Sequence, residues 1–485
     1  MTTVDPDSPE FKERALHAAV HGLRESDPLA SASVAFLPWQ RNSLLAALTV
    51  VVLCTVFFPR PTLTVLVALC TLGYLAVMAD RILIFKRGMA RDSIMTVSDE
   101  RALAATDLPP YTILVPAYGE PEVVGDLVGA LDRIDYPRDR LQVLLLLEED
   151  DAPTIEAAYA AGIGASAKAH IEVVLVPPAD PRTKPKACNY GLQRASGDIV
   201  TIYDAEDIPD PLQLRRVVAA FRELPDTVVC VQAKLAFHNP GQNLLTAWFT
   251  MDYGLWFGYL LPGLMRSRAP IPLGGTSNHF KRDVVTAIGA WDPYNVTEDA
   301  DLGVRIAARG FATAVIDSVT LEEANPDPIN WIRQRSRWYK GYLQSWLVHT
   351  RRPIELWRNI GTVGFIRFTL FLAGTPIIAC LNLVFWFISL SWLLGQPWQI
   401  GVLFPAVVYF PALIALLIGN ASTIYMNLVA CRENDRADLL FACLTSPLYW
   451  LMMSIAATKG CWQLVRNPSY WEKTFHGLGT TEKQA

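Results

Sequence analysis

Long apolar blocks flank a polar middle segment of this chain. They cover residues 43–58, 62–85, about 364–395, 401–430 and 438–458. A helix needs ~20 apolar residues to cross a hydrocarbon layer of ~30 Å, and the first block reaches this length with Leu37-Pro38-Trp39 as an interfacial lead-in. The simple count is therefore five transmembrane spans, and the first two form a hairpin around Pro59-Arg60-Pro61.

Lysine and arginine residues set the expected orientation of these spans. Such residues favour the cytoplasmic side of a membrane, and here they border the middle segment at Lys86, Arg87, Arg91, Arg351, Arg352 and Arg358. The middle segment is therefore expected in the cytoplasm. Basic residues after the last block also favour a cytoplasmic tail, which conflicts with five full spans. Residues 438–458 could form a re-entrant or interfacial element broken at Pro447. Alternatively, the block at 364–395 could divide near Pro376.

In the middle segment, short apolar runs alternate with helical stretches. The predicted strands are Tyr111–Val115, Gln142–Leu147, Ile171–Val176, Ile199–Tyr203, Val228–Gln232 and Ala314–Asp317. The predicted helices are Val123–Ile134, Thr154–Ala160, Ala187–Arg194 and Pro211–Glu223. Alternation of strands and helices with short connections predicts an α/β domain whose mostly parallel sheet is covered on both faces.

The expected organisation places this domain between membrane segments. The predicted units are a cytoplasmic tail (1–40), a transmembrane hairpin (41–86), a cytoplasmic domain (107–350) with interfacial helices near 244–265 and 330–348, C-terminal transmembrane helices (360–460) and a cytoplasmic tail (461–485). The first ~35 residues lack the pattern of a secretory signal peptide. Eight scattered cysteines show no metal-ligand spacing, and a net charge of −5 argues against nucleic acid as a partner.

Acidic loops follow two of the predicted strands. Glu148–Asp151 follows Gln142–Leu147, and Asp204–Asp207 follows Ile199–Tyr203. The carboxyl ends of parallel strands share one edge of a sheet, so these loops and Pro116–Glu120 should open on one crevice. Each loop taken alone also fits a solvated turn or a helix cap.

Two carboxylates in Asp204-Ala205-Glu206 can face a hard cation through oxygen. Mg²⁺ or Mn²⁺ held by one or two carboxylates plus phosphate oxygens is the usual arrangement for nucleotide substrates. Lys184-Pro185-Lys186 opens a helix shortly before this site, where lysine could bind phosphate, although a solvated turn is the alternative. We therefore predict Asp204 and Glu206 as metal ligands and Lys186 as a phosphate contact.

Thr297-Glu298-Asp299 precedes a helical run, and an acidic first turn is typical of a helix N-terminus. Catalysis would instead need a carboxylate within hydrogen-bond reach of an acceptor hydroxyl, as general base. The loop at 274–279 fits a tight turn that lets the backbone approach a bound acceptor, which makes Gly275 and Thr276 candidate acceptor contacts. Turn chemistry alone would also explain its glycines.

Arginine and aromatic residues are mixed in and around the segment from Gln334 to Trp338. An interfacial amphipathic helix would carry such a mixture. Guanidinium groups also match phosphate geometry, and a tryptophan face packs against a sugar ring, so one helix can serve both roles. The aromatic segment Leu244–Met265 is also expected to be interfacial, because a span there would separate the acidic loops from Gln334–Trp338.

Four motifs occur in a fixed order: VPAYGE at 115–120, Asp204-Ala205-Glu206, Thr297-Glu298-Asp299 and QRSRW at 334–338. In this order they resemble the processive membrane glycosyltransferases of family two, the group that includes cellulose, hyaluronan and chitin synthases. The resemblance covers about Tyr111 to Gly341 and extends to the flanking spans. It implies a GT-A fold inserted between transmembrane α-helices, inverting transfer, a UDP-activated sugar and a divalent metal.

The resemblance also implies a role for each motif residue. Tyr118, Glu120 and Glu149 would lie near the nucleotide, and Asp204 with Glu206 would bind metal and diphosphate. Asp299 would be the base, with Glu298 beside it at the catalytic position. Gln334, Arg335 and Arg337 would hold the diphosphate, while Trp338 would lie beneath the acceptor sugar at the mouth of a channel.

The chain departs from the family pattern at two acidic sites. Glu206 stands where a second aspartate is usual, and Asp207 could substitute for it as a ligand. Four acidic residues occupy 148–151 where two are usual, which leaves the nucleotide contact within this loop open.

The expected function is polymerisation of a β-linked polysaccharide from a UDP-hexose, with glucose favoured, and translocation of the product through the enzyme's own spans. The alternative is transfer of one sugar to a lipid acceptor such as polyprenyl phosphate or diacylglycerol. A transporter or scaffold without catalysis is a further alternative, which the full set of ionisable residues disfavours. Expected partners are a UDP-sugar, a growing glycan or lipid acceptor and the bilayer of a bacterial-type inner membrane, and they could include accessory export proteins.

Overall fold

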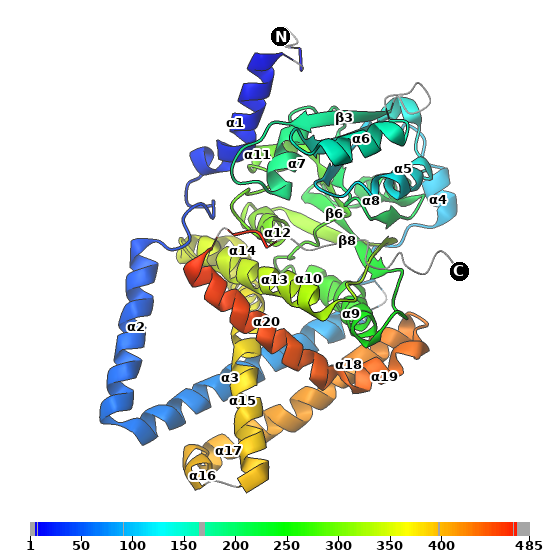
Figure 1. The fold of residues 1–485 in the computed structure, drawn as a ribbon. Helices are drawn as coiled ribbons and strands as arrows, with labels where there is room; N and C mark the ends of the chain where they lie inside the picture. The colour runs from blue at the N-terminus through cyan, green and yellow to red at the C-terminus, as the bar shows by residue number, and fades with distance from the viewer. Residues whose placement is uncertain are drawn as a thin grey trace.

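The computed structural model describes residues 5–6, 8–90, 92–163, 170–395, 398–468 and 470–472. A sheet covered by helices forms one end of the molecule, at the top of Figure 1, and long apolar helices form the other. The predicted C-terminal tail falls mostly outside the described residues, because 473–485 are not among them.

In the described part of the chain, eight strands form one sheet in the order β3-β2-β1-β4-β7-β6-β8-β5. Their bounds are β1 (Tyr111–Ala117), β2 (Leu141–Glu148), β3 (Ile171–Val176), β4 (Ile199–Ile202), β5 (Ile208–Pro209), β6 (Val228–Phe237), β7 (Asn278–Lys281) and β8 (Ala312–Glu322). Pairs β1/β2, β1/β4, β2/β3 and β6/β8 are parallel. Strand β7 is antiparallel to β4 and β6, and β5 is antiparallel to β8. The sheet is therefore mostly parallel, as predicted.

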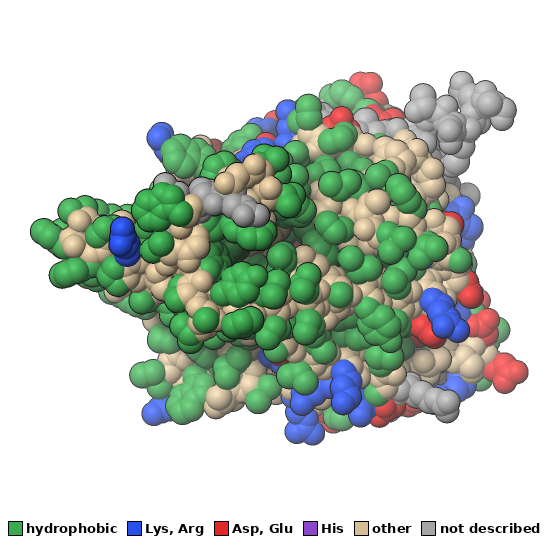
Figure 2. Space-filling view, turned by 90° about the horizontal axis from the view of Figure 1, so that it is seen from below, with side chains coloured by type: hydrophobic (Ala, Val, Ile, Leu, Met, Phe, Trp, Pro, Cys, Tyr) green, Lys and Arg blue, Asp and Glu red, His purple; other side chains and the backbone are tan. Residues whose placement is uncertain are grey.

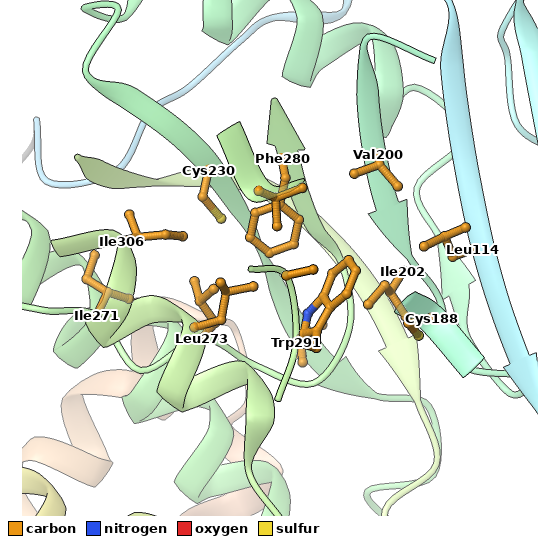
Figure 3. Close-up of a cluster of buried hydrophobic side chains, with 14 of the residues drawn as sticks. Leu114, Cys188, Val200, Ile202, Cys230, Ile271, Leu273, Phe280, Trp291 and Ile306 are labelled. Atoms are coloured by element: carbon orange, nitrogen blue, oxygen red, sulfur yellow. The ribbon is translucent and has the colours of Figure 1, made fainter. Parts of the chain in front are cut away.

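Hydrophobic clusters cover both faces of the sheet because its strands are apolar on both sides, as buried parallel strands usually are. Side chains alternate along β1, so Leu114 belongs to one cluster while Ile113 and Val115 belong to the other. Figure 3 shows the Leu114 side, where Phe280 and Trp291 fill the space between strand and helix side chains.

Helices of the domain lie before, between and after the strands. They are α4 (Asp99–Leu103), α5 (Val124–Asp132), α6 (Ala152–Ala160), α7 (Lys184–Leu192), α8 (Gln213–Glu223), α11 (Arg282–Ala287) and α12 (Glu298–Ala308). The four predicted helices correspond to α5, α6, α7 and α8, with ends that differ by up to three residues. Helix α7 begins three residues earlier than predicted, at Lys184, which changes where its lysines point.

The N-terminal segment contains a helix that packs on the domain, where a tail was expected. Helix α1 (Pro9–Ser26) begins after Ser8, whose side chain accepts a hydrogen bond from the backbone N–H of Phe11. It packs against α7 through a buried apolar stripe that includes Ala19 and Leu23. The turn after α11 also contacts α1 at Gly289, whose φ is 90°, because a Cβ atom there would lie 2.6 Å from the Leu23 side chain.

Apolar helices occupy the opposite end of the molecule. Among the described residues, four helices or merged helices have the length and composition of a membrane span: Pro38–Phe57 (α2), Pro59–Gly88 (α3), Pro353–Gly395 (α14, η4, α15) and Ala406–Glu433 (α17, η5, α18). A fifth candidate is the pair Ala437–Leu444 and Ser446–Arg466 (α20), bent by 62° at a break next to Pro447, which is a broken span or a re-entrant element. Figure 2 views this end, where hydrophobic side chains cover most of the surface and charged ones lie mainly at its edges.

Two helical segments lie between the sheet and the apolar helices. Residues 244–266 form α9 (Leu244–Leu255), η3 (Trp256–Leu260) and α10 (Leu261–Arg266), which pack against the end of α3. Helix α13 (Pro328–His349) packs along α20. A Cβ atom on Gly460 of α20 would lie 2.7 Å from the Ser336 carbonyl oxygen, so these two helices meet backbone to backbone.

Candidate active site

A cavity of about 580 Å³ opens where the carboxyl ends of the strands face α13 and the apolar helices. Residues of the domain that line it include Tyr118, Glu120, Glu148, Arg182, Lys184, Asp204, Glu206, Gly275, Glu298, Asp299, Glu322, Gln334, Arg335, Arg337 and Trp338. Residues of the apolar helices also line it, among them Asp80, Arg81, Phe371, Thr423, Asn427 and Met453. The three predicted loops and the QRSRW segment therefore share one cavity, which continues toward the membrane helices.

The acidic turn after β4 is held by a buried carboxylate. One oxygen of Asp207 accepts hydrogen bonds from the backbone N–H of Asp204, at 2.7 Å, and from the hydroxyl of Thr276. Its other oxygen has no hydrogen-bond partner among the described residues. Burial, followed by the negative charges of Asp204 and Glu206, raises the pKa of Asp207 well above its ordinary value. The turn therefore brings the carboxyl groups of Asp204, Glu206 and Asp207 close together, and a nearby positive charge would stabilise their ionised forms.

Lys184 at the start of α7 supplies part of the opposing charge. Its ammonium group forms an ion pair with Asp204 and donates a hydrogen bond to the Gly275 carbonyl oxygen at 2.8 Å. Burial lowers the pKa of Lys184, but the charge and hydrogen bond of Asp204 together with Cys188 and Glu298 outweigh burial, and the pKa is raised. In its charged form, Lys184 thus joins the acidic turn to the loop at 274–279, called the glycine loop below.

Lys186, the predicted phosphate contact, lies elsewhere. Its side chain is fully buried and forms an ion pair with Glu148 at 2.8 Å. It also donates a hydrogen bond to the Pro177 carbonyl oxygen at 3.2 Å. The cavity lining contains Glu148 and Lys184 but, among the described residues, not Lys186.

Glu298 and Asp299 form the first turn of α12 and face the cavity. Asp299 lies beside the glycine loop, because a Cβ atom on Gly275 would be 3.4 Å from its Oδ2 atom and 3.9 Å from Lys184 Nζ. Burial raises the pKa of Asp299 to about 6 and that of Glu298 to about 8. Lys184 and Arg337 act in the opposite direction on both groups. A carboxylate whose pKa lies near neutral pH is suited to accept a proton.

Helix α13 holds the loop that leads into this turn. A Cβ atom on Gly341 would lie 2.4 Å from two atoms of the Thr297 side chain, so only glycine permits this contact. The Gln344 side chain accepts a hydrogen bond from the backbone N–H of Val296 at 3.2 Å. Asn295 donates to the hydroxyl of Ser345 at 3.0 Å. The helix that carries QRSRW therefore also supports the residues before Asp299.

The two arginines of QRSRW have different surroundings. Arg335 donates hydrogen bonds to Asp252 at 2.7 Å and to the Tyr449 hydroxyl at 3.0 Å. Its guanidinium group also lies 4.5 Å from the centre of the Trp338 ring, a cation–π distance. The guanidinium group of Arg335 is therefore held mainly by contacts within the protein.

Arg337 instead stacks on Trp471, with 4.5 Å between its guanidinium carbon and the ring centre. Its Nε atom, like that of Arg335, has no hydrogen-bond partner in the described part of the chain, and no carboxylate pairs with Arg337 there as Asp252 pairs with Arg335. Burial lowers the pKa of Arg337, while Glu298 and Asp299 oppose this effect. Of the two arginines, Arg337 is the better placed to bind an anion in the cavity.

Other predicted site residues vary in position. Tyr118, Glu120, Gln334 and Trp338 line the cavity, whereas Glu149 is exposed and lies outside the described lining. Thr276 is buried beneath the glycine loop, and its hydroxyl oxygen, which contacts Asp207, also lies 3.0 Å from the Ile202 carbonyl oxygen. The roles assigned to all these residues stay predictions.

The lining residues that the sequence did not single out include Lys184, Glu322 and Trp471. Lys184 belongs to a motif that was recognised, but Lys186 was chosen from it. Glu322 ends β8, and burial followed by the charge of Asp207 raises its pKa well above the ordinary value. Its position at the carboxyl end of a strand could have indicated that Glu322 faces the cavity. Trp471 follows α20, and no local pattern indicates that it returns to the cavity.

The acidic residues fit a divalent cation that also binds a substrate. Among the described residues, no group of three or more His, Cys, Asp or Glu side chains is arranged to hold a metal ion by itself. Mg²⁺ and Mn²⁺ commonly take one or two carboxylates and complete their shell with phosphate oxygens. The unpaired Asp207 oxygen and the raised pKa values of Asp207 and Glu322 both indicate a place where positive charge would be stabilising.

Residues 109–341 match the family model described as Glycosyltransferase like family 2. This segment, slightly less than half of the chain, contains the whole sheet and the QRSRW helix as far as Gly341. It is a glycosyltransferase family 2 domain, and its mostly parallel mixed sheet has a GT-A-like fold. The predicted fold class is confirmed.

Several known proteins are similar to the chain. Glucomannan 4-beta-mannosyltransferase 2 of Arabidopsis thaliana is 25% identical over 301 residues, 58% of this chain and 55% of that protein. The beta-monoglucosyldiacylglycerol synthase of Synechocystis sp. is 26% identical over 264 residues, 53% of this chain and 54% of that protein. The chain spans about half the length of the curated relatives it matches. Among solved structures, a mannosyltransferase from Pyrobaculum calidifontis in complex with GDP-Man and Mn²⁺ aligns over 82% of this chain and 99% of that one, with 18% identity and a TM-score of 0.47.

Proposed function

We propose that the chain is an inverting, membrane-embedded hexosyltransferase that polymerises a β-linked polysaccharide from a UDP-hexose, with glucose as the first candidate. The observation that carries this proposal is the single cavity shared by Asp204, Asp299 and Arg337, which continues to residues of the apolar helices. A donor bound at the strand ends and an acceptor arriving from the membrane side could meet there. The glucomannan mannosyltransferase relative supports a hexose polymer as product.

In the proposed reaction, the acceptor hydroxyl attacks the anomeric carbon while the bond from that carbon to the diphosphate oxygen breaks. Asp299 takes the hydroxyl proton, and its raised pKa makes it a stronger base than an exposed aspartate. Arg337 binds the diphosphate as its negative charge increases. Lys184 holds the Asp204 turn and the Gly275 backbone in fixed positions around the sugar. No covalent enzyme intermediate is required.

Asp204 and Glu206 would hold Mg²⁺ or Mn²⁺, which would neutralise charge on the departing diphosphate. Trp338 and Tyr342 are aromatic residues of the lining that could pack against acceptor sugar rings. We place the domain on the cytoplasmic side of a bacterial-type inner membrane, because basic residues flank it at both membrane borders. Accessory export proteins could complete the pathway of the product.

A second candidate function is transfer of one sugar to a lipid acceptor. The beta-monoglucosyldiacylglycerol synthase relative supports it, and so does the cavity lining by residues of the apolar helices, which a lipid headgroup could reach from the bilayer. An acceptor with a free hydroxyl, such as diacylglycerol, would use Asp299 as base in the same way. A phosphate acceptor is already ionised and would not need it.

One experiment separates the candidates. Membranes that contain the chain are incubated with a panel of radiolabelled nucleotide sugars, including UDP-glucose, and the products are divided by organic extraction and gel filtration. A labelled polymer in the aqueous phase supports the polymerase. A single sugar on an extractable lipid supports the second candidate and overturns the first. Incorporation from none of the donors, with the protein shown to be folded, overturns both.

A further inference from the structure

The segment between α1 and α2 lies against the loop that leads to Asp299. Two buried charged side chains, Asp292 and Arg351, bind one backbone N–H and three carbonyl oxygens of residues 29–34. Asp292 comes seven residues before Asp299, and Arg351 follows the end of α13. The segment then runs directly into α2, which begins at Pro38.

Asp292 accepts hydrogen bonds from donor groups of this segment. Its side chain is fully buried, and it accepts a hydrogen bond from the backbone N–H of Ala32 at 2.5 Å and from the hydroxyl of Ser31 at 3.2 Å. It also accepts from the backbone N–H of Tyr294 at 3.1 Å, within its own loop. The carboxylate therefore joins the N-terminal segment to the start of the loop that leads into Glu298 and Asp299, the first turn of α12.

Arg351 donates hydrogen bonds to carbonyl oxygens of the same segment. It is 6% exposed, and it donates to the carbonyl oxygens of Leu29 at 3.1 Å, Ser31 at 2.8 Å and Val34. Asp292 and Arg351 thus contact the segment through opposite backbone groups. If the segment left, both charges would lose hydrogen bonds while still buried, which is costly.

A third contact ties α1 to the same loop through α7. The Asn189 amide donates to the carbonyl oxygens of Ala19 at 3.1 Å and Trp291 at 2.7 Å, and it accepts from the backbone N–H of Trp291 at 3.1 Å. Trp291, labelled in Figure 3, is buried in the core beside Phe280. Asn189 lies on the helix that begins with Lys184, so two elements of the cavity share this anchor.

We propose that residues 8–34 are a positioning element of the active site, and that Asp292 and Arg351 are positioning residues that fix the loop leading into Glu298 and Asp299 at the start of α12. Neither residue touches the cavity in the described lining, so neither is catalytic. The kinetic part of this inference rests on the proposed transferase activity, and the structural part does not. Because the segment continues into α2, the position of the base depends on a part of the chain that is attached to the first span. Gln40 of α2 strengthens this link by donating to the Leu347 carbonyl oxygen of α13 at 2.8 Å.

The test compares full-length protein variants in lipid nanodiscs by hydrogen exchange and kinetics. Arg351→Ala and Asp292→Ala should increase amide exchange in peptides that cover 291–301, while exchange in β1 and α5 stays at the wild-type rate. The turnover number kcat should fall by up to about 100-fold, the effect of displacing a catalytic group by ~1 Å, with less change in the donor KM. Arg351→Lys and Asp292→Asn keep part of the hydrogen bonding and should recover part of kcat.

Controls separate positioning from loss of fold. Arg309→Ala removes an ion pair of 3.5 Å between Asp27 and a side chain that is 56% exposed, so it should leave exchange in 291–301 and kcat near wild type. Ser31→Ala removes one hydroxyl donor and gives a mild variant if the alanine changes at the charged positions unfold the chain. Unchanged exchange in 291–301, or an increase shared by the whole domain, would overturn the inference. If the chain transfers no sugar at all, a local increase still supports the structural link, whereas the proposed function fails separately.

Discussion

Gly341 of α13 lies so close to Thr297 that a Cβ atom would come within 2.4 Å of the threonine side chain. Thr297 directly precedes Glu298 and Asp299, so the helix that carries Arg337 and Trp338 also sets the position of the first turn of α12. Backbone contact of this kind leaves little room for relaxation, because protein interiors are close-packed.

Gly341→Ala should therefore displace the Thr297 loop and lower kcat by about 10- to 100-fold, with little change in nucleotide binding. Transfer assays and titration with a nucleoside diphosphate measure the two effects. Thr297→Ser removes one of the closest atoms, so the double variant should recover part of the activity. Gly129→Ala in α5 is the matched control, since no described atom outside its own helix and chain neighbours lies within 4 Å of its Cβ position. Equal kcat in Gly341→Ala and wild type would contradict the proposed coupling.

Asp299→Asn should abolish turnover by at least about 100-fold, because a general base contributes 10²- to 10⁴-fold. The affinity for the nucleotide sugar should stay close to wild type. Asp283→Asn, at an exposed position in the first turn of α11, is the control for a change of charge alone. Full activity of Asp299→Asn would remove this residue from the role of base.

The pH dependence of kcat should reflect the raised pKa of Asp299. The ionised form is the base, so activity should be present above the pKa and be lost as pH falls through about 6. An exposed aspartate would lose activity only near pH 4. Lys184 lowers this pKa, so Lys184→Met should move the acid limb of the profile to higher pH. Lys281→Met, a lysine outside the described cavity lining, should leave the limb unchanged. An acid limb near pH 4 in wild type would show that Asp299 is not the titrating base.

The two lysines of α7 should respond differently to substitution. Lys186→Met leaves Glu148 buried without its partner, which should cost about 3–5 kcal/mol of stability and lower the melting temperature. The double variant Lys186→Met/Glu148→Gln should recover part of this loss. Lys184→Met should instead reduce transfer with a smaller effect on melting. If Lys186→Met melts like wild type but binds nucleoside diphosphate weakly, Lys186 is a phosphate contact after all.

The sequence predicted β1, β2 and β3 to within two residues at each end, because their continuous apolar runs leave little choice of structure. It ended the two longest strands five residues too early, β6 at Gln232 rather than Phe237 and β8 at Asp317 rather than Glu322. It did not predict β5 and β7, which have two and four residues. Segments this short carry no periodicity, and their pairing depends on neighbouring strands brought together by the fold. The apolar blocks were also clear, because length and composition suffice to identify them.

Within the candidate site, single-residue choices were harder. Glu148 is the last residue of β2 and lines the cavity, whereas Glu149 is exposed, and a shift of one position in a strand reverses the direction of a side chain. Lys184 and Lys186 differ by two helical positions, which places them on different sides of α7. A sequence motif locates such a site. Which of its residues faces the cavity depends on the direction in which each side chain leaves the strand or helix.

The contact between Gly460 and Ser336 links α20, one half of the bent helix pair that is a candidate span, to the helix whose residues line the cavity. Any side chain at 460 would push α13 away from α20, and with it Arg337, Trp338 and the support of Asp299. A change in the tilt of α20 would therefore move these residues without any change in the cavity lining itself.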